Sequence, residues 1–263
     1  MLRLRILSAL VLAPPALAAV WLGGWAFVAL VSLAAAVMGW EWQRLTTGGF
    51  GPAGVAASAA GIAAAALGAQ SPELALAVVG LVGLGVAGEG LLRHRPATAW
   101  LAWGVLYIGI PVTSLVWLRG LPEGGRAALV WLFLVIWATD IGAYAAGRSI
   151  GGPLLAPRVS PKKTWAGLIG GMVSAAMVGA VAARLLDHPS MLPLAMFSGL
   201  MAVVAQIGDL GESWVKRRFG VKDSSNVIPG HGGVFDRVDG LIAAAPVVAL
   251  AAWAAGEGWL AWR

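Results

Sequence analysis

Residues 127–147 read AALVWLFLVIWATDIGAYAAG, and Asp140 is the only charged side chain among them. A helix needs about 20 mostly apolar residues to cross a bilayer, so this run is long enough to span one. The whole chain has the same character, because 59% of its 263 residues are hydrophobic and 11% are charged. Such a composition excludes a soluble domain, which carries about 25% charged residues, and a disordered chain. It predicts a polytopic integral membrane protein.

Similar apolar runs recur along the chain and predict an all-α fold of about nine transmembrane helices. The predicted spans are Ile6–Leu22, Trp25–Trp40, Ala53–Ala69, Leu74–Gly88, Ala97–Leu118, Ala127–Gly147, Trp165–Leu185, Leu192–Gly208 and Gly240–Ala255. The third and fourth are the weakest, being rich in Ala and Gly, and are also compatible with one broken hairpin. We expect one membrane domain over residues 1–263, with N-terminal helices in 1–126 and catalytic helices and cytoplasmic loops in 127–263.

The basic residues predict how these spans are oriented. With the N-terminus in the cytoplasm, fourteen of the 18 Lys and Arg residues fall in cytoplasmic segments. Basic residues favour that side of a membrane, so the division predicts a cytoplasmic N-terminus and an odd number of spans. The first segment also resembles a signal peptide, but Trp21 follows its small residues directly and favours a retained span. Trp40 and Trp42 fall near the end of the second span, where tryptophan rings favour the membrane interface.

Ionisable groups at membrane depth are costly and usually functional, and here they gather in three segments of the second half. The first segment holds Asp140, which shares one helix face with Tyr144 and Arg148 at helical spacing. Asp140 is either a site carboxylate facing a water-filled cavity or a structural partner in an ion pair or helix–helix hydrogen bond. The chain has no cysteine, which excludes disulfides, thiolate metal sites and cysteine nucleophiles.

The second segment, residues 148–164, is rich in Gly and Pro and therefore does not form a continuous helix. Its polar residues stand just before the next span, and they are Ser160, Lys162, Lys163 and Thr164. Hydroxyl donors and paired ammonium groups ahead of a helix N-terminus suit a phosphate. The same residues also suit topology alone, because cytoplasmic loops are basic and lysines attract anionic lipids.

The third segment, residues 206–240, holds most of the remaining charges. If the helix continues past Asp209, then Asp209, Ser213 and Lys216 lie on one face until Gly220 breaks the helix. The Gly and Pro residues around His231 predict a turn where backbone can approach a ligand closely.

Asp236 and Asp239 follow this turn and open the last span on a common face. We expect the helix end at Asp209 to meet them. Carboxylates without cysteine suit Mg²⁺, which takes oxygen ligands and shares them with substrate phosphates. Acidic metal ligands beside basic residues are what phosphoryl or nucleotidyl transfer requires. The alternatives are a solvated, salt-bridged loop and a His231 that only hydrogen-bonds its own turn.

Residues 213–239, SWVKRRFGVKDSSNVIPGHGGVFDRVD, resemble the signature of the phosphatidate cytidylyltransferases, also called CDP-diacylglycerol synthases. Two further segments are similar to this family: WATDIGAYAAGR at 137–148 and SPKKTWAGLIGG at 160–171. The matching signature positions are Ser213, Lys216, Arg217, Lys222, Asp223, Pro229, His231, Gly232, Gly233, Asp236, Arg237 and Asp239. The first half of the chain carries no family motif.

The resemblance implies a nucleotidyltransferase of phospholipid biosynthesis that makes CDP-diacylglycerol and pyrophosphate from CTP and phosphatidic acid. It implies an often dimeric protein of a bacterial-type inner membrane, among membrane lipids, with its site facing the cytoplasm and no nucleic-acid partner. It also implies Mg²⁺ on Asp209, Asp236 and Asp239, and is compatible with a second, monovalent cation such as K⁺. We expect Lys216 and Arg237 to act in catalysis with these aspartates. The expected substrate-binding residues are Ser160, Lys162, Lys163, Thr164, Ser213, Arg217, Lys222, Asp223, His231, Gly232, Gly233 and Asp140.

Two other membrane functions fit parts of the sequence. A transporter or channel could use Asp140 and the broken loops for ion coupling, but transporter sites lie near the midplane, away from most polar residues here. A CDP-alcohol phosphatidyltransferase also uses aspartates and Mg²⁺. Its spaced aspartate pattern is not found, because an apolar run follows Asp239 and Gly240 without interruption.

Overall fold

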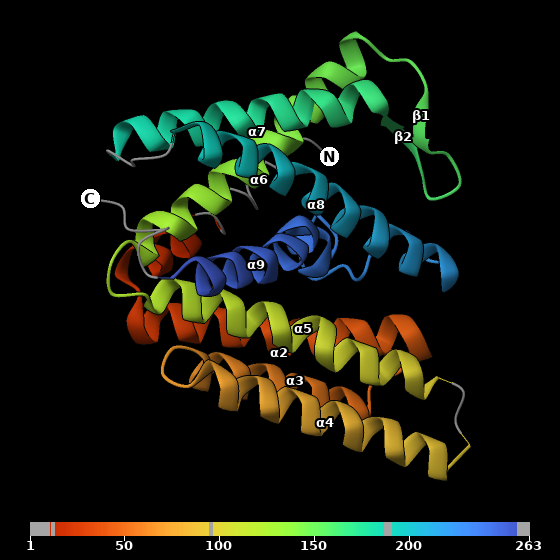
Figure 1. The fold of residues 1–263 in the computed structure, drawn as a ribbon. Helices are drawn as coiled ribbons and strands as arrows, with labels where there is room; N and C mark the ends of the chain where they lie inside the picture. The colour runs from red at the N-terminus through yellow and green to blue at the C-terminus, as the bar shows by residue number, and fades with distance from the viewer. Residues whose placement is uncertain (1–10, 12–13, 95–96, 187–190, 257–263) are drawn as a thin grey trace. The chain divides into compact units, whose positions relative to one another are not determined.

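The computed structural model describes residues 11, 14–94, 97–186 and 191–256, which are almost entirely helical (Figure 1). Residues 14–22 are helical. The later helices are α2 (Gly24–Thr47), α3 (Pro52–Gly68), α4 (Pro72–Leu92), α5 (Thr98–Gly120), α6 (Gly125–Ser149), α7 (Trp165–Leu185), α8 (Met191–Arg218) and α9 (Phe235–Ala255). Two short strands, β1 (Leu154–Ala156) and β2 (Ser160–Thr164), pair antiparallel between α6 and α7. The prediction of an all-α fold is therefore confirmed apart from this hairpin, which the sequence analysis left as a non-helical loop.

Seven of the described helices are long and apolar enough to cross a membrane, and the chain is an integral membrane protein. The helix α3 is shorter, with 17 residues, and is separate from α4, so the third and fourth predicted spans are two helices. The predicted first span begins at Ile6, and its residues 6–10, 12 and 13 lie outside the described residues. The count of nine spans and the cytoplasmic N-terminus thus stay predictions.

The chain folds into two compact units. Unit 1 comprises Met1–Gly120 and Arg218–Val238, and unit 2 comprises Leu121–Arg217 and Asp239–Arg263. Residues 218–238 of the signature therefore belong to the same unit as the N-terminal helices.

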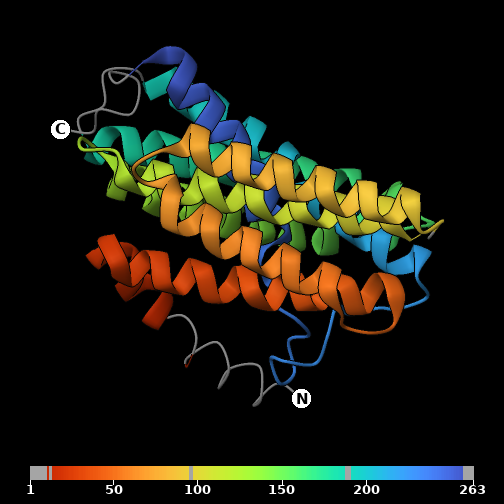
Figure 2. The ribbon, with the colours of Figure 1, turned by 90° about the horizontal axis from the view of Figure 1, so that it is seen from below.

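Unit 1 is built on α2 to α5, which run side by side in both views (Figures 1 and 2). Small residues let these helices approach: a Cβ added at Gly61 of α3 would lie 2.8 Å from the Cβ of Ala35 in α2. The buried Gln43 ties the two helices together at the turn between them. Its Oε1 accepts from the backbone N–H groups of Gly51 (2.8 Å) and Gly54 (2.7 Å), which satisfies donors at the start of α3.

Unit 2 contains α6 and α7, packed closely along their lengths, together with α8 and most of α9. A Cβ added at Gly142 of α6 would collide with the Ser174 hydroxyl of α7, so glycine permits this approach. The fully buried Trp131 of α6 donates from its indole N–H to the Ser198 hydroxyl of α8 at 3.0 Å. These contacts fix the helices that carry the polar residues of the second half.

Three helices extend beyond their predicted spans at an acidic residue. The helix α2 continues past Trp40 through Glu41, α8 continues past Gly208 through Asp209, and α9 begins before Gly240 and includes Asp236. The predicted spans stopped at these positions because charged residues lower the average hydropathy. Each of these carboxylates has hydrogen-bond partners inside its own unit.

Candidate active site

The first polar cluster lies in unit 2 around Asp209 of α8. The Lys163 ammonium of β2 donates to Oδ2 of Asp209, and the Ser213 hydroxyl, one turn further along α8, donates to Oδ1 at 3.3 Å. The Lys163 and Asp209 side chains are 18% and 30% exposed, so the ion pair is only partly open to solvent. A charged pair in such a position is screened less than a surface pair and can act on a bound anion.

The helices α8 and α9 meet closely next to this pair. A Cβ added at Gly208 would lie 2.7 Å from the backbone carbonyl oxygen of Asp239 and 2.5 Å from the Cβ of Ala243. Asp239 is thereby close enough to Asp209 and Lys163 for their charges to interact, and its Oδ1 accepts from the Gly240 N–H at 2.7 Å. The expected meeting of these two helix ends is confirmed for Asp209 and Asp239.

The β hairpin separates the two adjacent lysines. Successive residues of a strand point to opposite sides, and Lys162 is exposed whereas Lys163 turns inward to Asp209. Thr164 is buried at the N-cap of α7, where its hydroxyl accepts from the Gly167 N–H at 3.0 Å. The polar run before α7 therefore divides into an exposed cation, a paired cation and a helix cap.

Lys216 lies on α8 with Asp209 and Ser213, because the helix continues past Asp209 as the shared face requires. Its ammonium donates to Oε2 of Glu212 at 3.1 Å, and these side chains are only 10% and 4% exposed. A buried ion pair of this kind is costly to break, because the remaining charge loses its partner. The structure thus gives Lys216 a structural partner one turn away.

Asp140 lies on an exposed face of α6. Both interpretations of Asp140, a site carboxylate and a structural partner, stay predictions. The shared face predicted for this helix is present, because Arg148 donates to the Tyr144 hydroxyl at 3.3 Å.

The second polar cluster lies in unit 1, in the segment between α8 and α9. Gly220 turns the chain after α8 with a φ of +73°. The predicted turn around His231 is present. The backbone N–H of Ile228 donates to the Gly232 carbonyl at 2.8 Å, and the backbone N–H of His231 donates to the Ile228 carbonyl at 2.9 Å. Gly232 has a φ of +84°, which favours glycine, and a Cβ there would lie 2.6 Å from Oδ2 of Asp236.

Asp236 holds this segment against the first turn of α9. Its Oδ2 accepts from the Ser224 N–H (2.9 Å), the Ser224 hydroxyl (2.8 Å) and the Gly233 N–H (2.7 Å). Hydrogen bonds to an ionised acceptor are the stronger kind. Asp236 therefore has a clear structural role, whether or not it also binds a metal ion.

Glu41 of α2 is the residue that the sequence analysis missed. It is fully buried, and its Oε1 accepts from the Ser225 hydroxyl (2.6 Å) and the Val234 N–H (2.9 Å). Its Oε2 accepts from the Phe235 N–H (3.0 Å) and the Ser224 hydroxyl (3.4 Å). The available signal was an acidic residue directly after an apolar run, in a half of the chain otherwise judged only by its hydropathy.

Aromatic side chains bind the same segment to the N-terminal helices. Trp42 is buried within the protein and donates its indole N–H to the Trp100 carbonyl at 2.7 Å, and its position near the membrane interface stays a prediction. The Trp42 ring lies 5.7 Å from that of Phe235, and the Tyr107 ring stacks on Phe235 at 5.9 Å. Trp100 meets Phe219 edge to face at 5.2 Å.

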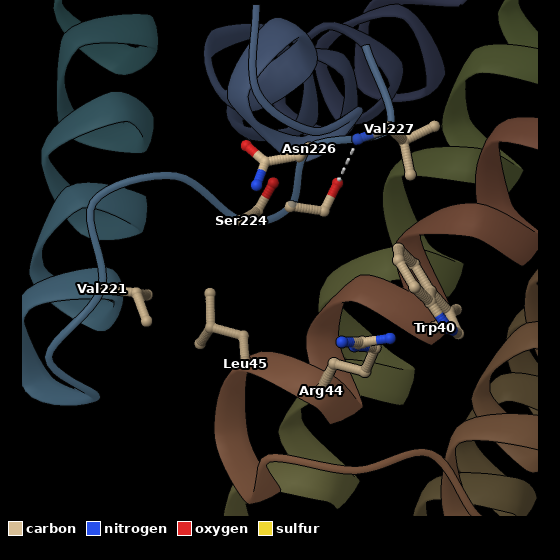
Figure 3. Close-up of a pocket in the computed structure, with 8 residues that line it drawn as sticks. Trp40, Arg44, Leu45, Val221, Ser224, Asn226 and Val227 are labelled. Carbon is tan, nitrogen blue, oxygen red and sulfur yellow. Dashed lines mark hydrogen bonds between the residues drawn. The ribbon is translucent and has the colours of Figure 1, made fainter. Parts of the chain in front are cut away.

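A pocket of about 440 Å³ opens between α2 and this segment (Figure 3). The Arg44 guanidinium lies over the Trp40 ring, 4.8 Å from its centroid, on the α2 side. The pocket is lined by Trp40, Arg44, Leu45, Val221, Ser224, Ser225, Asn226 and Val227. It combines a cation, hydroxyls and apolar surface, as small-molecule sites do.

A family model for the cytidylyltransferase family matches residues 3–254. The chain belongs to the cytidylyltransferase family. A relative from Brucella suis biovar 1, named phosphatidate cytidylyltransferase, is 40% identical over 249 residues, which cover 95% of this chain and 92% of the relative. A protein of the same name from Pseudomonas aeruginosa is 39% identical over 272 residues, covering 98% and 99%. This cytidylyltransferase thus matches its relatives in the first half too, where the sequence analysis found no motif.

The structure also describes the remaining candidate residues of this cytidylyltransferase. The exposed ones are Arg217, Lys222, Asp223 and Arg237, and the half-buried ones are Ser160 and His231. Within the described residues, no three His, Asp or Glu side chains are grouped so that they could hold a metal ion. Of the three predicted ligands, Asp209 and Asp239 come together in unit 2, whereas Asp236 belongs to the unit 1 segment.

Proposed function

We propose that this cytidylyltransferase transfers the cytidylyl group of CTP to phosphatidic acid, giving CDP-diacylglycerol and pyrophosphate for phospholipid biosynthesis. The observation that carries the proposal is the family match over residues 3–254, with relatives named for this activity. A phosphate oxygen of phosphatidic acid attacks the α-phosphorus of CTP, and the bond from that phosphorus to the pyrophosphate oxygen breaks. No covalent nucleophile is needed, so Ser160 and Ser213 serve as hydrogen-bond donors.

The two substrates are both anions and repel each other, so the site needs fixed positive charge. Lys163 is the best-placed cation in the proposal, because Asp209 holds its ammonium in a partly buried position. Lys222 and Arg237 are exposed and available to phosphates. Lys216 is left out of this role because its ammonium is buried against Glu212.

We include Mg²⁺ in the proposal, held by Asp209 and Asp239, with Asp236 as a further ligand implied by the resemblance. Oxygen-only ligands suit this ion, and two carboxylates brought together favour a cation beside them. Mg²⁺ commonly takes one or two carboxylates and completes its shell with water and substrate phosphates, so a group of three protein ligands is not required. When bound, the ion would neutralise phosphate charge that develops during transfer. A K⁺ ion and a homodimer stay predictions from the resemblance.

The direct test is pyrophosphate release by the full chain purified in detergent. We expect release that requires both CTP and phosphatidic acid. A transporter would release none, and a CDP-alcohol phosphatidyltransferase would consume CDP-diacylglycerol with an alcohol instead. Absence of CTP-dependent release from folded protein would overturn the proposal.

The proposed cytoplasmic orientation can be tested with single cysteines, because the chain has none. Lys162→Cys and Lys222→Cys are exposed positions on the proposed cytoplasmic side, and Glu123→Cys is an exposed position on the opposite side. In intact cells a membrane-impermeant maleimide should label position 123 alone, and in inverted vesicles it should label 162 and 222. Labelling of 162 or 222 in intact cells would contradict the orientation.

The neighbouring lysines give a matched test of the phosphate site. Lys163→Ala should lower kcat/KM by about 10- to 100-fold, because it removes a partly buried cation whose charge acts on the anions. Lys162→Ala should lower it by about threefold or less, since an exposed charge is screened. Pyrophosphate release per folded enzyme measures both. Equal, small effects would mean that the two lysines serve topology and lipid attraction.

A further inference from the structure

Each carboxylate oxygen of Glu41 accepts from a different backbone N–H. Oε1 accepts from Val234 and Oε2 accepts from Phe235. A backbone N–H can only donate, so a glutamine would place its NH₂ donors against one of the two. A carboxylate offers an acceptor oxygen to each group. The need for two acceptor oxygens therefore favours glutamate at position 41 over glutamine, which has nearly the same size.

The hydrogen bonds that surround the Glu41 carboxylate all come from one segment of the chain, residues 224–235. A fully buried carboxylate is destabilising unless hydrogen bonds replace its water, and the four described donors all come from residues 224–235. Gly233 allows the close approach, because a Cβ there would collide with Oε1 of Glu41 and with the Ser224 hydroxyl. The buried carboxylate of Glu41 therefore depends on hydrogen bonds from residues 224–235, and the conformation of residues 224–235 depends on that carboxylate.

The same contacts lead to Asp236. The Ser224 hydroxyl has a single hydrogen and lies 2.8 Å from Oδ2 of Asp236 and 3.4 Å from Oε2 of Glu41, so it stands between the two carboxylates and donates mainly to Asp236. The bond from Phe235 to Glu41 fixes the residue directly before Asp236. Ser224 and Ser225 also line the pocket that faces Arg44 (Figure 3). A shift of the Glu41 contacts would move the pocket wall and the Asp236 side chain together.

We propose that Glu41 is a positioning residue for cytidylyl transfer. From the N-terminal half of the chain it holds residues 224–235, and through them the Asp236 carboxylate, in the arrangement needed for turnover. This role rests on the proposed function, and it gives α2 a part in the reaction without contact with the reacting atoms.

The test compares Glu41→Gln with Glu41→Asp in the purified full chain. Gln matches the size of Glu but loses one acceptor, whereas Asp is shorter but keeps both. Loss of a residue that orients a site commonly costs about 10- to 100-fold, so we expect that fall in kcat for Glu41→Gln. We expect the KM for CTP to change less than kcat, and Glu41→Asp to be the more active variant. Hydrogen exchange of the amides at 234 and 235 should quicken in Glu41→Gln, with α6 and α7 unchanged.

A matched control is Glu89→Gln, which alters an exposed pair with Arg93 in the same unit and should change none of these readings. If Glu41→Gln keeps wild-type kcat, or if both variants only lower Tm at unchanged kcat, Glu41 is structural and the proposal is wrong. If Glu41→Gln does not fold, Ser225→Ala removes one donor to Oε1. Normal kcat and normal exchange in that variant would overturn the proposal. Failure of the wild type to release pyrophosphate would instead count against the proposed function.

Discussion

Asp209→Asn should abolish cytidylyl transfer while the helices of unit 2 stay packed. The substitution keeps the shape of the side chain but removes the charge that holds the Lys163 ammonium and, in the proposal, a Mg²⁺ ion. We expect kcat/KM to fall by about 100-fold or more, which corresponds to at least ~2.7 kcal/mol of transition-state stabilisation. Tm without ligands should change little, because the lost ion pair opposes the relief of repulsion between Asp209 and Asp239.

Pyrophosphate release measured across a Mg²⁺ series checks this expectation. Added Mg²⁺ should rescue Asp209→Asn poorly, because the lost charge acts in the transition state as well as in binding. Glu89→Gln likewise replaces a carboxylate with an amide, but in an exposed ion pair. It should leave turnover unchanged, since exposed pairs contribute little to stability. Near-normal turnover of Asp209→Asn would remove Asp209 from the site and leave Lys163 to act alone.

The hydropathy of the sequence predicts the membrane helices well, because length and apolar content decide whether a helix can span a bilayer. Residues 165–185 were placed at the bounds that the structure has. A predicted span covers only the apolar run, and the helices extend further where a carboxylate follows, as at Glu41 and Asp209. The β hairpin before α7 was missed because its Gly and Pro residues indicate only the absence of a helix.

The candidate site could be predicted only where its partners are near in sequence. The Ser213 and Asp209 contact follows from helical spacing. The bonds from Glu41 to Ser224 and Phe235 join residues 183 and 194 positions apart, and local sequence patterns do not indicate such pairings. By contrast, Lys216 pairs with Glu212 one turn away on α8, and this spacing can be read from the sequence.

The signature segment belongs to the unit of the N-terminal helices. Residues 218–238 follow α8 in sequence, and they pack with the N-terminal helices through Glu41, Trp42 and Trp100. The first half therefore contributes specific polar and aromatic contacts in addition to its apolar spans. Its match to the relatives over the same length is consistent with that contribution.

Asp236 should respond differently to removal of its charge and removal of its side chain. Asp236→Asn keeps an oxygen that can accept from the Ser224 and Gly233 donors, so the segment should stay folded. Asp236→Ala leaves those donors without that acceptor and should lower the free energy of unfolding by about 2 kcal/mol or more. If the carboxylate charge also serves the metal ion, both variants should lose about 100-fold or more in kcat/KM, although only Asp236→Ala loses stability. Tm together with pyrophosphate release on the purified variants separates the two effects. A stable Asp236→Asn protein with near-normal turnover would show that Asp236 orders the segment and binds no metal ion.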